Sequence, residues 1–394
     1  MILYFSFNLG EKDFSGLPTY SSMFLEKFKN KEAVIINIIA DPDENIEQYK
    51  QRRYESLYIY DCYLPSFLSS YKPSLENMII DIISEFDIDK IIMPDYLLEE
   101  YIEAVDNRIG LKKNNIKKVL FIHLLYTGLM HRFLHEPYFD QHILSSMTYL
   151  GKNAHIEWRA VITSDIIICN SEFTMNELKK YYDDCNLSQK EIYAIPLGVF
   201  KNEIQFSPNL ESKRWAYFGR LDSMKGLWYI SKDMVLNKEL YQENPPIVCG
   251  DGMLEMLFMK ANFFEKLVDY KGLKNKVELA EILKDVKYCV FPSIYEPWGL
   301  ALTEALAMGK ICIVSNYETG MLEQVKHLDN AILFDFRNQS IINFINRFNN
   351  NEFDIDLKNM SNRANETAND IDVHFDKLRS VLLNIQNFHK NLFF

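Results

Sequence analysis

The chain has 394 residues, of which 48% are hydrophobic, and its formal net charge is −12. A chain of this length is long for one hydrophobic core, so two domains are expected. The excess of acidic over basic residues argues against a nucleic-acid-binding protein, which would carry a strongly basic surface. A phosphorylated ligand would therefore have to be held by a few well-placed cations, against the net field of the chain.

The cysteines and the hydropathy predict a cytoplasmic protein. Six scattered cysteines show neither disulfide nor zinc spacing, as expected in a reducing compartment. The opening residues MILYFSF lack a basic n-region, and no run approaches about 18 consecutive apolar residues. The protein could still contact the inner membrane peripherally, and two regions are candidates. One is the lysine run Lys112, Lys113, Lys117 and Lys118. The other is the group of aromatic residues in a C-terminal helix, Phe388, Phe393 and Phe394.

The first half of the chain alternates short apolar strands with helical stretches, which predicts a doubly wound α/β domain. Strands are expected over residues 1–7, 33–40 and 166–169, and the segments KIIMPDY (90–96) and KKVLFIHLLYTG (117–128) are expected to pass from strand to loop. Gly10 and Gly16 lie in the loop after the first strand, where a βα loop must turn under a ligand.

Two pairs of aspartates have the D-x-D spacing that can hold a metal ion. Asp41 and Asp43 follow the second strand, and Asp87 and Asp89 repeat the pattern. Because the pattern is common by chance, we interpret both pairs as surface acids and predict no metal site.

The second half opens after a polar linker over residues 200–213 with a strand, Trp215–Phe218, that runs into Gly219. Arg220 and Lys225 flank the following loop, which ends at Gly226 before a new helix. Two cations, two glycines and a helix start can together neutralise a diphosphate. The alternative is a pair of surface cations beside a turn.

The stretch from Tyr288 to Lys310 reads as strand, loop and helix. Glu296 lies in the loop, Gly299 and Leu300 open the helix, and Glu304 lies in its first turns. Both carboxylates can face the crevice at the carboxyl end of a parallel strand, where open α/β sheets bind ligands. In the alternative interpretation Glu296 is a solvated loop residue and Glu304 complements the helix dipole.

The segment EPWGLALTEALAMG closely resembles the Glu-x7-Glu motif of retaining GT-B glycosyltransferases of the "glycosyl transferases group 1" family, and GRLDSMKG resembles their second signature. The resemblance implies that Glu296 holds donor-sugar hydroxyls, that Glu304 holds the nucleotide ribose, and that Arg220 and Lys225 grip the pyrophosphate. Trp298 stands where the family usually has phenylalanine. Gly219, Gly299 and Leu300 are expected donor-binding positions.

The resemblance extends to three further places. His123 lies at the end of an expected strand, shortly before Thr127 and Gly128. A histidine in an apolar strand is usually a core residue. The resemblance implies instead that His123 matches the histidine that family members keep beside the transferred sugar. Gly16 stands alone, followed by Leu17, where the family loop often has two adjacent glycines. Near residue 320, Thr319 replaces the first glycine of a Gly-Gly pair and Gly320 keeps the second.

The implied architecture is an α/β GT-B fold, in which two Rossmann-like doubly wound domains face a central cleft. Residues 1–200 would bind the acceptor, residues 201–374 the nucleotide sugar, and residues 375–394 would form a helix that crosses back to the first domain.

The implied function is metal-independent transfer of a sugar, with retention of anomeric configuration, from a nucleotide-diphosphate donor to an acceptor hydroxyl. No cofactor is expected, and a UDP-sugar is favoured over a GDP-sugar. The acceptor would be a saccharide, lipid-linked or small molecule, in bacterial glycan, lipopolysaccharide or glycolipid synthesis. A same-fold phosphorylase or synthase, and a non-catalytic sugar-binding or scaffold subunit, are the alternatives.

Overall fold

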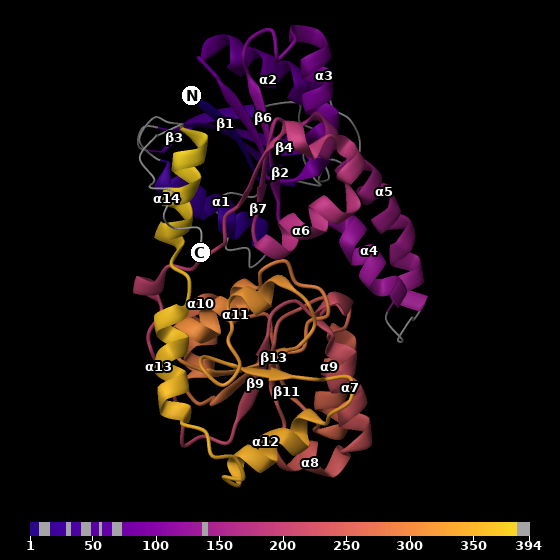
Figure 1. Ribbon diagram of the computed structural model, residues 1–394, viewed down its shortest axis with the longest axis vertical. Coiled ribbons are helices and arrows are strands. Elements are labelled where there is room, and N and C mark those ends of the chain that lie inside the picture. The colour runs from indigo at the N-terminus through magenta and orange to yellow at the C-terminus, as the bar shows by residue number, and fades with distance from the viewer. Residues whose placement is uncertain are drawn as a thin grey trace.

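The computed structural model describes residues 1–7, 16–28, 33–40, 49–54, 57–64, 73–135 and 141–383. Within them the chain forms two α/β domains, one above the other (Figure 1). Gly10, the Asp41 and Asp43 pair, and the aromatic residues Phe388, Phe393 and Phe394 lie outside the described residues.

The first domain is built on an eight-stranded sheet in the order β3-β4-β2-β1-β5-β6-β7-β8, parallel except for the β3–β4 pair. Its strands are β1 (Ile2–Phe7), β2 (Ala33–Ala40), β3 (Tyr49–Tyr54), β4 (Leu57–Leu64), β5 (Lys90–Met93), β6 (Lys117–Ile122), β7 (Ile166–Cys169) and β8 (Glu191–Ala194). The helices are α1 (Gly16–Lys27), α2 (Pro73–Glu85), α3 (Glu99–Ile109), α4 (Tyr126–His135), α5 (Gln141–Thr163) and α6 (Glu172–Tyr181).

The central strands of this sheet are apolar on both faces, because helices cover both. In β1, Leu3 and Phe5 join one core cluster while Ile2 and Tyr4 join the other. All five strands expected in the first half are confirmed. The β3–β4 hairpin was not predicted: the sequence of β3, YKQRRY, is polar because the strand forms an edge of the sheet.

The second domain is a six-stranded, fully parallel sheet in the order β11-β10-β9-β12-β13-β14. In chain order this is 3-2-1-4-5-6, the doubly wound arrangement of a dinucleotide-binding sheet. The strands are β9 (Trp215–Phe218), β10 (Ile247–Cys249), β11 (Asp269–Gly272), β12 (Tyr288–Phe291), β13 (Ile311–Ser315) and β14 (Ile332–Phe334). The helices are α7 (Leu227–Leu236), α8 (Lys238–Glu243), α9 (Glu255–Lys260), α10 (Lys276–Leu283), α11 (Leu300–Ala307), α12 (Ile341–Asn349) and α13 (Leu357–Thr367).

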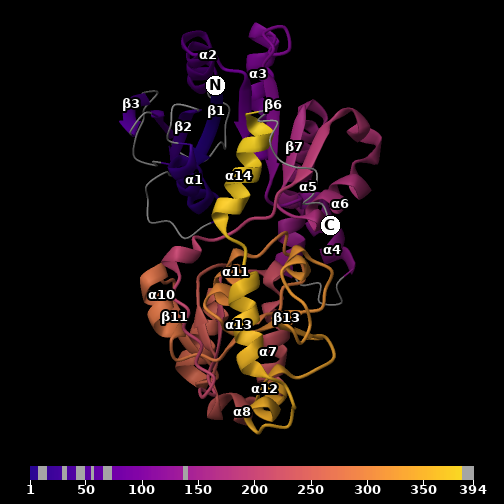
Figure 2. The same ribbon diagram turned by 60° about the vertical axis from the view of Figure 1, so that its left-hand side comes forward.

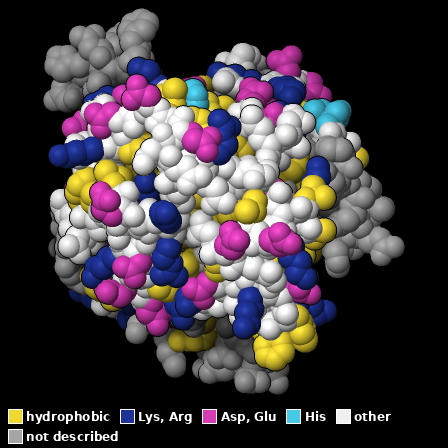
Figure 3. Space-filling view, turned by 90° about the horizontal axis from the view of Figure 1, so that it is seen from below, with side chains coloured by type: hydrophobic (Ala, Val, Ile, Leu, Met, Phe, Trp, Pro, Cys, Tyr) yellow, Lys and Arg dark blue, Asp and Glu magenta, His cyan; other side chains and the backbone are white. Residues whose placement is uncertain are grey.

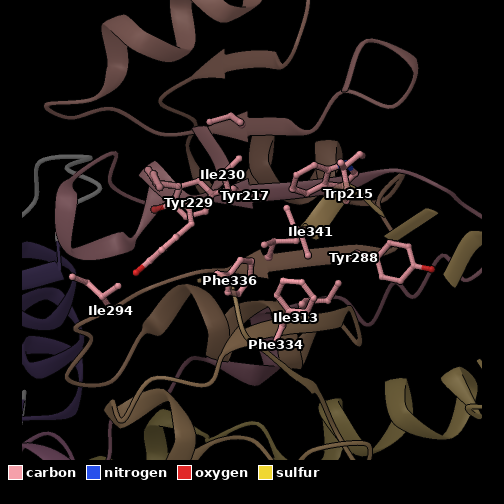
Figure 4. Close-up of a cluster of buried hydrophobic side chains, with 14 of the residues drawn as sticks. Trp215, Tyr217, Tyr229, Ile230, Tyr288, Ile294, Ile313, Phe334, Phe336 and Ile341 are labelled. Atoms are coloured by element: carbon pink, nitrogen blue, oxygen red, sulfur yellow. The ribbon is translucent and has the colours of Figure 1, made fainter. Parts of the chain in front are cut away.

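One face of the second sheet carries a large aromatic and aliphatic core. Trp215 and Tyr217 of β9, Tyr288 of β12 and Ile313 of β13 point to this face (Figure 4). The alternate residues of the same strands pack on the other face against α11. Burial on both faces explains why these strands read as continuous apolar runs.

The chain passes between the domains twice. Val199 and Asp370 form a short parallel bridge, in which the Val199 N–H donates to the Asn369 carbonyl at 3.0 Å. The last described helix, α14 (Ile371–Leu382), then runs along the first domain, in line with α13 on the second (Figures 1 and 2). It begins before the expected residue 375, because the Asp370 side chain caps it by accepting the Asp372 N–H.

The helix that crosses back is held by aromatic packing. Phe375 is 1% exposed and packs against Tyr20, Phe24 and Phe28 of the first domain. The Tyr20 hydroxyl bonds the Nε2 atom of His374 at 2.9 Å. The His374 Nδ1–H donates to the Pro196 carbonyl, so the tyrosine hydroxyl is the donor to Nε2.

The first prediction concerns this packing. Phe375→Ala should destabilise the first domain by about 3–5 kcal/mol, because it leaves a cavity among aromatic rings. Urea unfolding followed by intrinsic fluorescence measures the loss. Val373→Ala, on the same helix but at a side chain that is 56% exposed, is the matched control. Equal stability of the two variants would show that the helix does not brace the first domain.

Candidate functional site

The strand order of the second sheet reverses between β9 and β12, so the loops that follow these strands lie side by side. The Met224 carbonyl in the first loop accepts the N–H groups of Ile294 and Tyr295 in the second, at 3.0 and 3.3 Å. Gly226 has φ of 65°, and a Cβ there would lie 2.1 Å from the Pro292 carbonyl oxygen. Only glycine permits this contact, which fixes the two loops at the usual ligand-binding edge of such a sheet.

This contact brings together two of the predicted site residues. The Lys225 ammonium forms an ion pair with the Glu296 carboxylate, and their side chains are only 16% and 11% exposed. The residues come from different loops, 71 positions apart in the chain. A buried ammonium and carboxylate in contact can together bind a hydroxyl group. The hydroxyl donates to the carboxylate and accepts from the ammonium.

Arg220 lies at the start of the loop after β9, immediately after Gly219. Its side chain is 59% exposed, and its Nε atom lies 3.4 Å from the Asp222 carboxylate. Burial raises the pKa of Asp222, while the neighbouring Arg220 opposes that shift. The Arg220 Nη2 group also donates to the Met224 Sδ atom at 3.5 Å, so the guanidinium is held at two atoms while most of its side chain stays exposed. Asp222 was not singled out from the sequence; its place between two cations in GRLDSMKG was the signal.

Glu304 lies on α11, which begins after Gly299. Gly299 has φ of 90°, and a Cβ there would lie 3.2 Å from Glu296 Cγ, so the two glutamates flank one tight turn. The Glu304 side chain is half-buried, and no hydrogen bond or ion pair of its carboxylate is found among the described residues. Burial raises its pKa, against a weaker opposite effect of Lys276. Leu300, the first residue of α11, is partly buried. It packs against one core cluster that contains first-domain residues and against another in the second domain.

The loop after β13 contacts the Glu296 loop through Gly320. The Gly320 N–H donates to the Glu296 carbonyl at 2.8 Å, and a Cβ on Gly320 would lie 1.7 Å from the Pro297 oxygen. The preceding Thr319 is extended, with φ of −149° and ψ of 164°. An extended residue needs no glycine, which explains why threonine is tolerated there.

In the first domain, His123 follows β6. Burial lowers its pKa to about 4, so the ring is neutral at neutral pH. The Tyr20 ring lies edge-on at a centroid distance of 5.0 Å, and the Asn170 amide donates to the His123 carbonyl at 3.1 Å. Gly16 is the first residue of α1; the loop before it is outside the described part of the chain.

The loops of the second domain contact the first domain directly. The Glu323 carboxylate accepts the N–H groups of Glu172 and Phe173 at 3.0 and 2.6 Å, which caps the start of α6. Tyr295 packs edge-on against Phe173 at 5.6 Å. Arg132 of α4 donates to the Glu318 carbonyl at 3.0 Å. The carboxyl edges of the two sheets therefore face one another across the interface.

Several buried polar atoms on these facing loops have no hydrogen-bond partner in the described structure. They are His123 Nε2, Asp222 Oδ1, Tyr295 OH, Trp298 Nε1 and Thr319 Oγ1. Buried polar atoms are normally paired, since each unpaired one costs about 1–3 kcal/mol. Four of these atoms lie on the loops that carry or contact the Lys225–Glu296 pair, which is typical of a polar ligand site, and the His123 atom lies in the first domain.

The second domain of the chain resembles known glycosyltransferases. Residues 200–368 match the family model described as glycosyl transferases group 1. An uncharacterized glycosyltransferase of Bacillus subtilis, YqgM, is 26% identical over 185 residues, which are 44% of this chain and 48% of that protein. MJ1607 of Methanocaldococcus jannaschii, also an uncharacterized glycosyltransferase, is 33% identical over 164 residues, 40% of this chain and 39% of that protein. The chain thus matches less than half the length of these curated relatives.

Solved structures match over almost the whole chain. Sucrose-phosphate synthase from Thermosynechococcus elongatus aligns with a TM-score of 0.71 and 16% identity, over 97% of this chain and 99% of that one. Anabaena HepE, in complex with UDP and glucose, aligns with a TM-score of 0.63 and 15% identity, over 98% and 99%. At these identities the likeness establishes the fold. The chain as a whole has the expected GT-B fold, and its residues 200–368 match the model of the glycosyl transferases group 1 family.

Proposed function

We propose that this protein is a retaining glycosyltransferase that moves a sugar from a nucleotide-diphosphate donor to an acceptor hydroxyl without a metal ion. The observation that carries the proposal is the Lys225–Glu296 pair at the strand-order reversal of a domain that matches this family, with Arg220 beside it. The GT-B fold alone would not suffice, because one fold supports many functions.

The proposed roles follow from the charge changes of the reaction. The bond between the anomeric carbon and the diphosphate oxygen breaks, and its electron pair leaves with the diphosphate. Arg220 and Lys225 stabilise this negative charge more strongly than they bind the intact donor, which lowers the barrier. These two cations supply the charge compensation for which other enzymes use a metal ion.

The acceptor oxygen then bonds to the same face of the anomeric carbon that the diphosphate leaves, and its proton passes to the departing phosphate oxygen. Glu296 orients the sugar hydroxyls, while Lys225 holds the Glu296 carboxylate in place. His123 contacts the sugar through a hydrogen bond of its neutral ring, since its pKa of about 4 leaves it uncharged at neutral pH. Backbone at Gly16, Gly219, Gly299 and Gly320 lies close to the donor.

The acceptor class and the donor base belong to the same proposal. We propose a UDP-sugar, in keeping with the UDP named for HepE, and a saccharide, lipid-linked or small-molecule acceptor in the cytoplasm of a bacterium. Among the described residues, no helix is both long enough and apolar enough to cross a membrane.

The second prediction tests the diphosphate site. The thermal midpoint of the protein should rise with UDP and less with GDP, ADP or dTDP, with or without EDTA. A ligand at about 100 times its dissociation constant adds about 2.7 kcal/mol to the native state. Arg220→Ala should abolish both this shift and sugar transfer, because the guanidinium binds the diphosphate.

Arg214→Ala is the matched control, since Arg214 is similarly exposed in the same domain. It directly precedes β9 and pairs with Asp269 at the start of β11, at the strand ends opposite the loops. An Arg220→Ala variant that transfers sugar normally would contradict the mechanism. If no nucleotide shifts the midpoint of the wild-type protein, the diphosphate site is not formed and the scaffold alternative is favoured.

The third prediction uses the raised pKa of Glu304. The folded protein holds this carboxyl protonated to a higher pH than the unfolded chain does. Compared with an uncharged residue at this position, Glu304 therefore makes the folded protein less stable as the pH rises through the folded pKa of its carboxyl. Glu304→Gln should make the unliganded protein more stable at pH 7.5, and this gain should shrink as the pH falls to about 4.3, the ordinary value of a glutamate.

The same Glu304→Gln variant should gain less stability from UDP than the wild-type protein, because a carboxylate offers two charged acceptor oxygens to the ribose hydroxyls and an amide offers one neutral oxygen. Urea unfolding at several pH values, with and without UDP, measures both effects. Glu203→Gln makes the same charge change at an exposed position and should produce neither. A destabilised Glu304→Gln protein at pH 7.5 would show that the carboxylate serves the fold.

A further inference from the structure

Helix α9 and the π-helical turn η6 (Ala261–Glu265) that follows it are apolar on the side that faces outward. Their inward residue is Phe258, which is fully buried. A surface helix normally turns polar residues outward. Here the outward side chains are Met253, Met256, Leu257, Met259, Phe263 and Phe264.

The two phenylalanines are the most prominent part of this surface. Phe263 and Phe264 are 77% and 71% exposed and pack edge to face with one another at 4.9 Å. The turn that displays them is fixed, because the Asn262 side chain accepts the Tyr270 N–H of β11 and Lys266 ends the turn in a left-handed conformation. The aromatic pair is therefore presented on a rigid base, and α9 lies on the flank of the domain opposite α13 (Figure 1).

Two unpaired cations lie on this surface although the chain as a whole is acidic. Glu265 is neutralised by Lys238, and Asp269 by Arg214 and Lys271. Lys260 and Lys266 are exposed and form no ion pair with any described residue. Elsewhere, the face seen from below mixes cationic and anionic side chains (Figure 3).

We propose that α9 and η6, with Lys260 and Lys266, form a docking surface for an anionic lipid bilayer. Protruding aromatic and Met side chains with flanking lysines are the composition of an interfacial membrane helix, in which the rings enter the headgroup boundary and the cations meet anionic lipid. A second copy of the chain is disfavoured, because a two-fold contact through this surface would bring the same unpaired lysines together.

This surface differs from the lysine run that the sequence suggested for membrane contact. In that run Lys117 pairs with Glu191, and Lys118 is buried and lies 3.4 Å from Asp106. The run lies at the amino end of β6, the end away from the candidate site. The α9 surface does not depend on the proposed function, because its docking can be measured without any substrate.

The fourth prediction is tested by co-sedimentation of the full chain with vesicles of phosphatidylcholine, alone or with about a quarter phosphatidylglycerol. The wild-type protein should sediment with the anionic vesicles and release at about 0.5 M NaCl, where screening is strong. The double variant Phe263→Ser and Phe264→Ser should lose at least about tenfold in partitioning, and Lys260→Glu about fivefold.

The matched control is the double variant Trp158→Ser and Ile162→Ser, which removes two side chains that are 42% and 40% exposed on α5 of the first domain. It should partition like the wild-type protein, and all variants should keep the wild-type thermal midpoint. The proposal is overturned if the wild-type protein ignores anionic vesicles, or if the phenylalanine variant binds them equally well. It is also overturned if light scattering shows that this surface forms a dimer instead of binding vesicles.

Discussion

The candidate site depends on one close contact between two loops of the second domain. The strand order reverses between β9 and β12, so the loops after these strands leave the sheet as neighbours. They can approach only because Gly226 has no side chain to meet the Pro292 carbonyl. The Met224 carbonyl then binds two N–H groups of the second loop. A side chain at residue 226 would separate Lys225 from Glu296 and remove the buried pair on which the proposed chemistry rests.

The first domain completes the site instead of merely covering it. Trp298, two residues after Glu296, packs in a cluster that includes Ile195, Leu197 and Phe375, where the chain crosses between the domains. Glu323 caps α6 of the first domain, and Gly320 of the same loop binds the Glu296 carbonyl. The loop that carries Glu296 is therefore held from both sides, so movement of one domain relative to the other would move this carboxylate.

The second domain places its two kinds of surface in different directions. The carboxyl ends of its strands present polar and charged groups that lack partners, which suits a small polar ligand. The flank formed by α9 and η6 presents highly exposed apolar side chains, which suits contact with an extended surface such as a lipid bilayer. Because α9 follows β10 directly, a bilayer docked on this flank would lie beside the domain edge that faces the candidate site.

The sequence by itself determined most of the buried strands, the loops after them and the residue types in those loops. Apolar runs such as residues 215–218 and 288–291 fix buried strands through local pattern, and glycines fix the turns that follow. Only the tertiary structure decided that Lys225 pairs with Glu296, that Glu323 caps a helix 150 residues away, and that Asp222 is buried beside Arg220. It also decided that the methionines and phenylalanines of α9 face outward. The physical reason is that periodicity reveals which residues are apolar or charged, whereas burial and pairing depend on neighbours that the fold brings from distant parts of the chain.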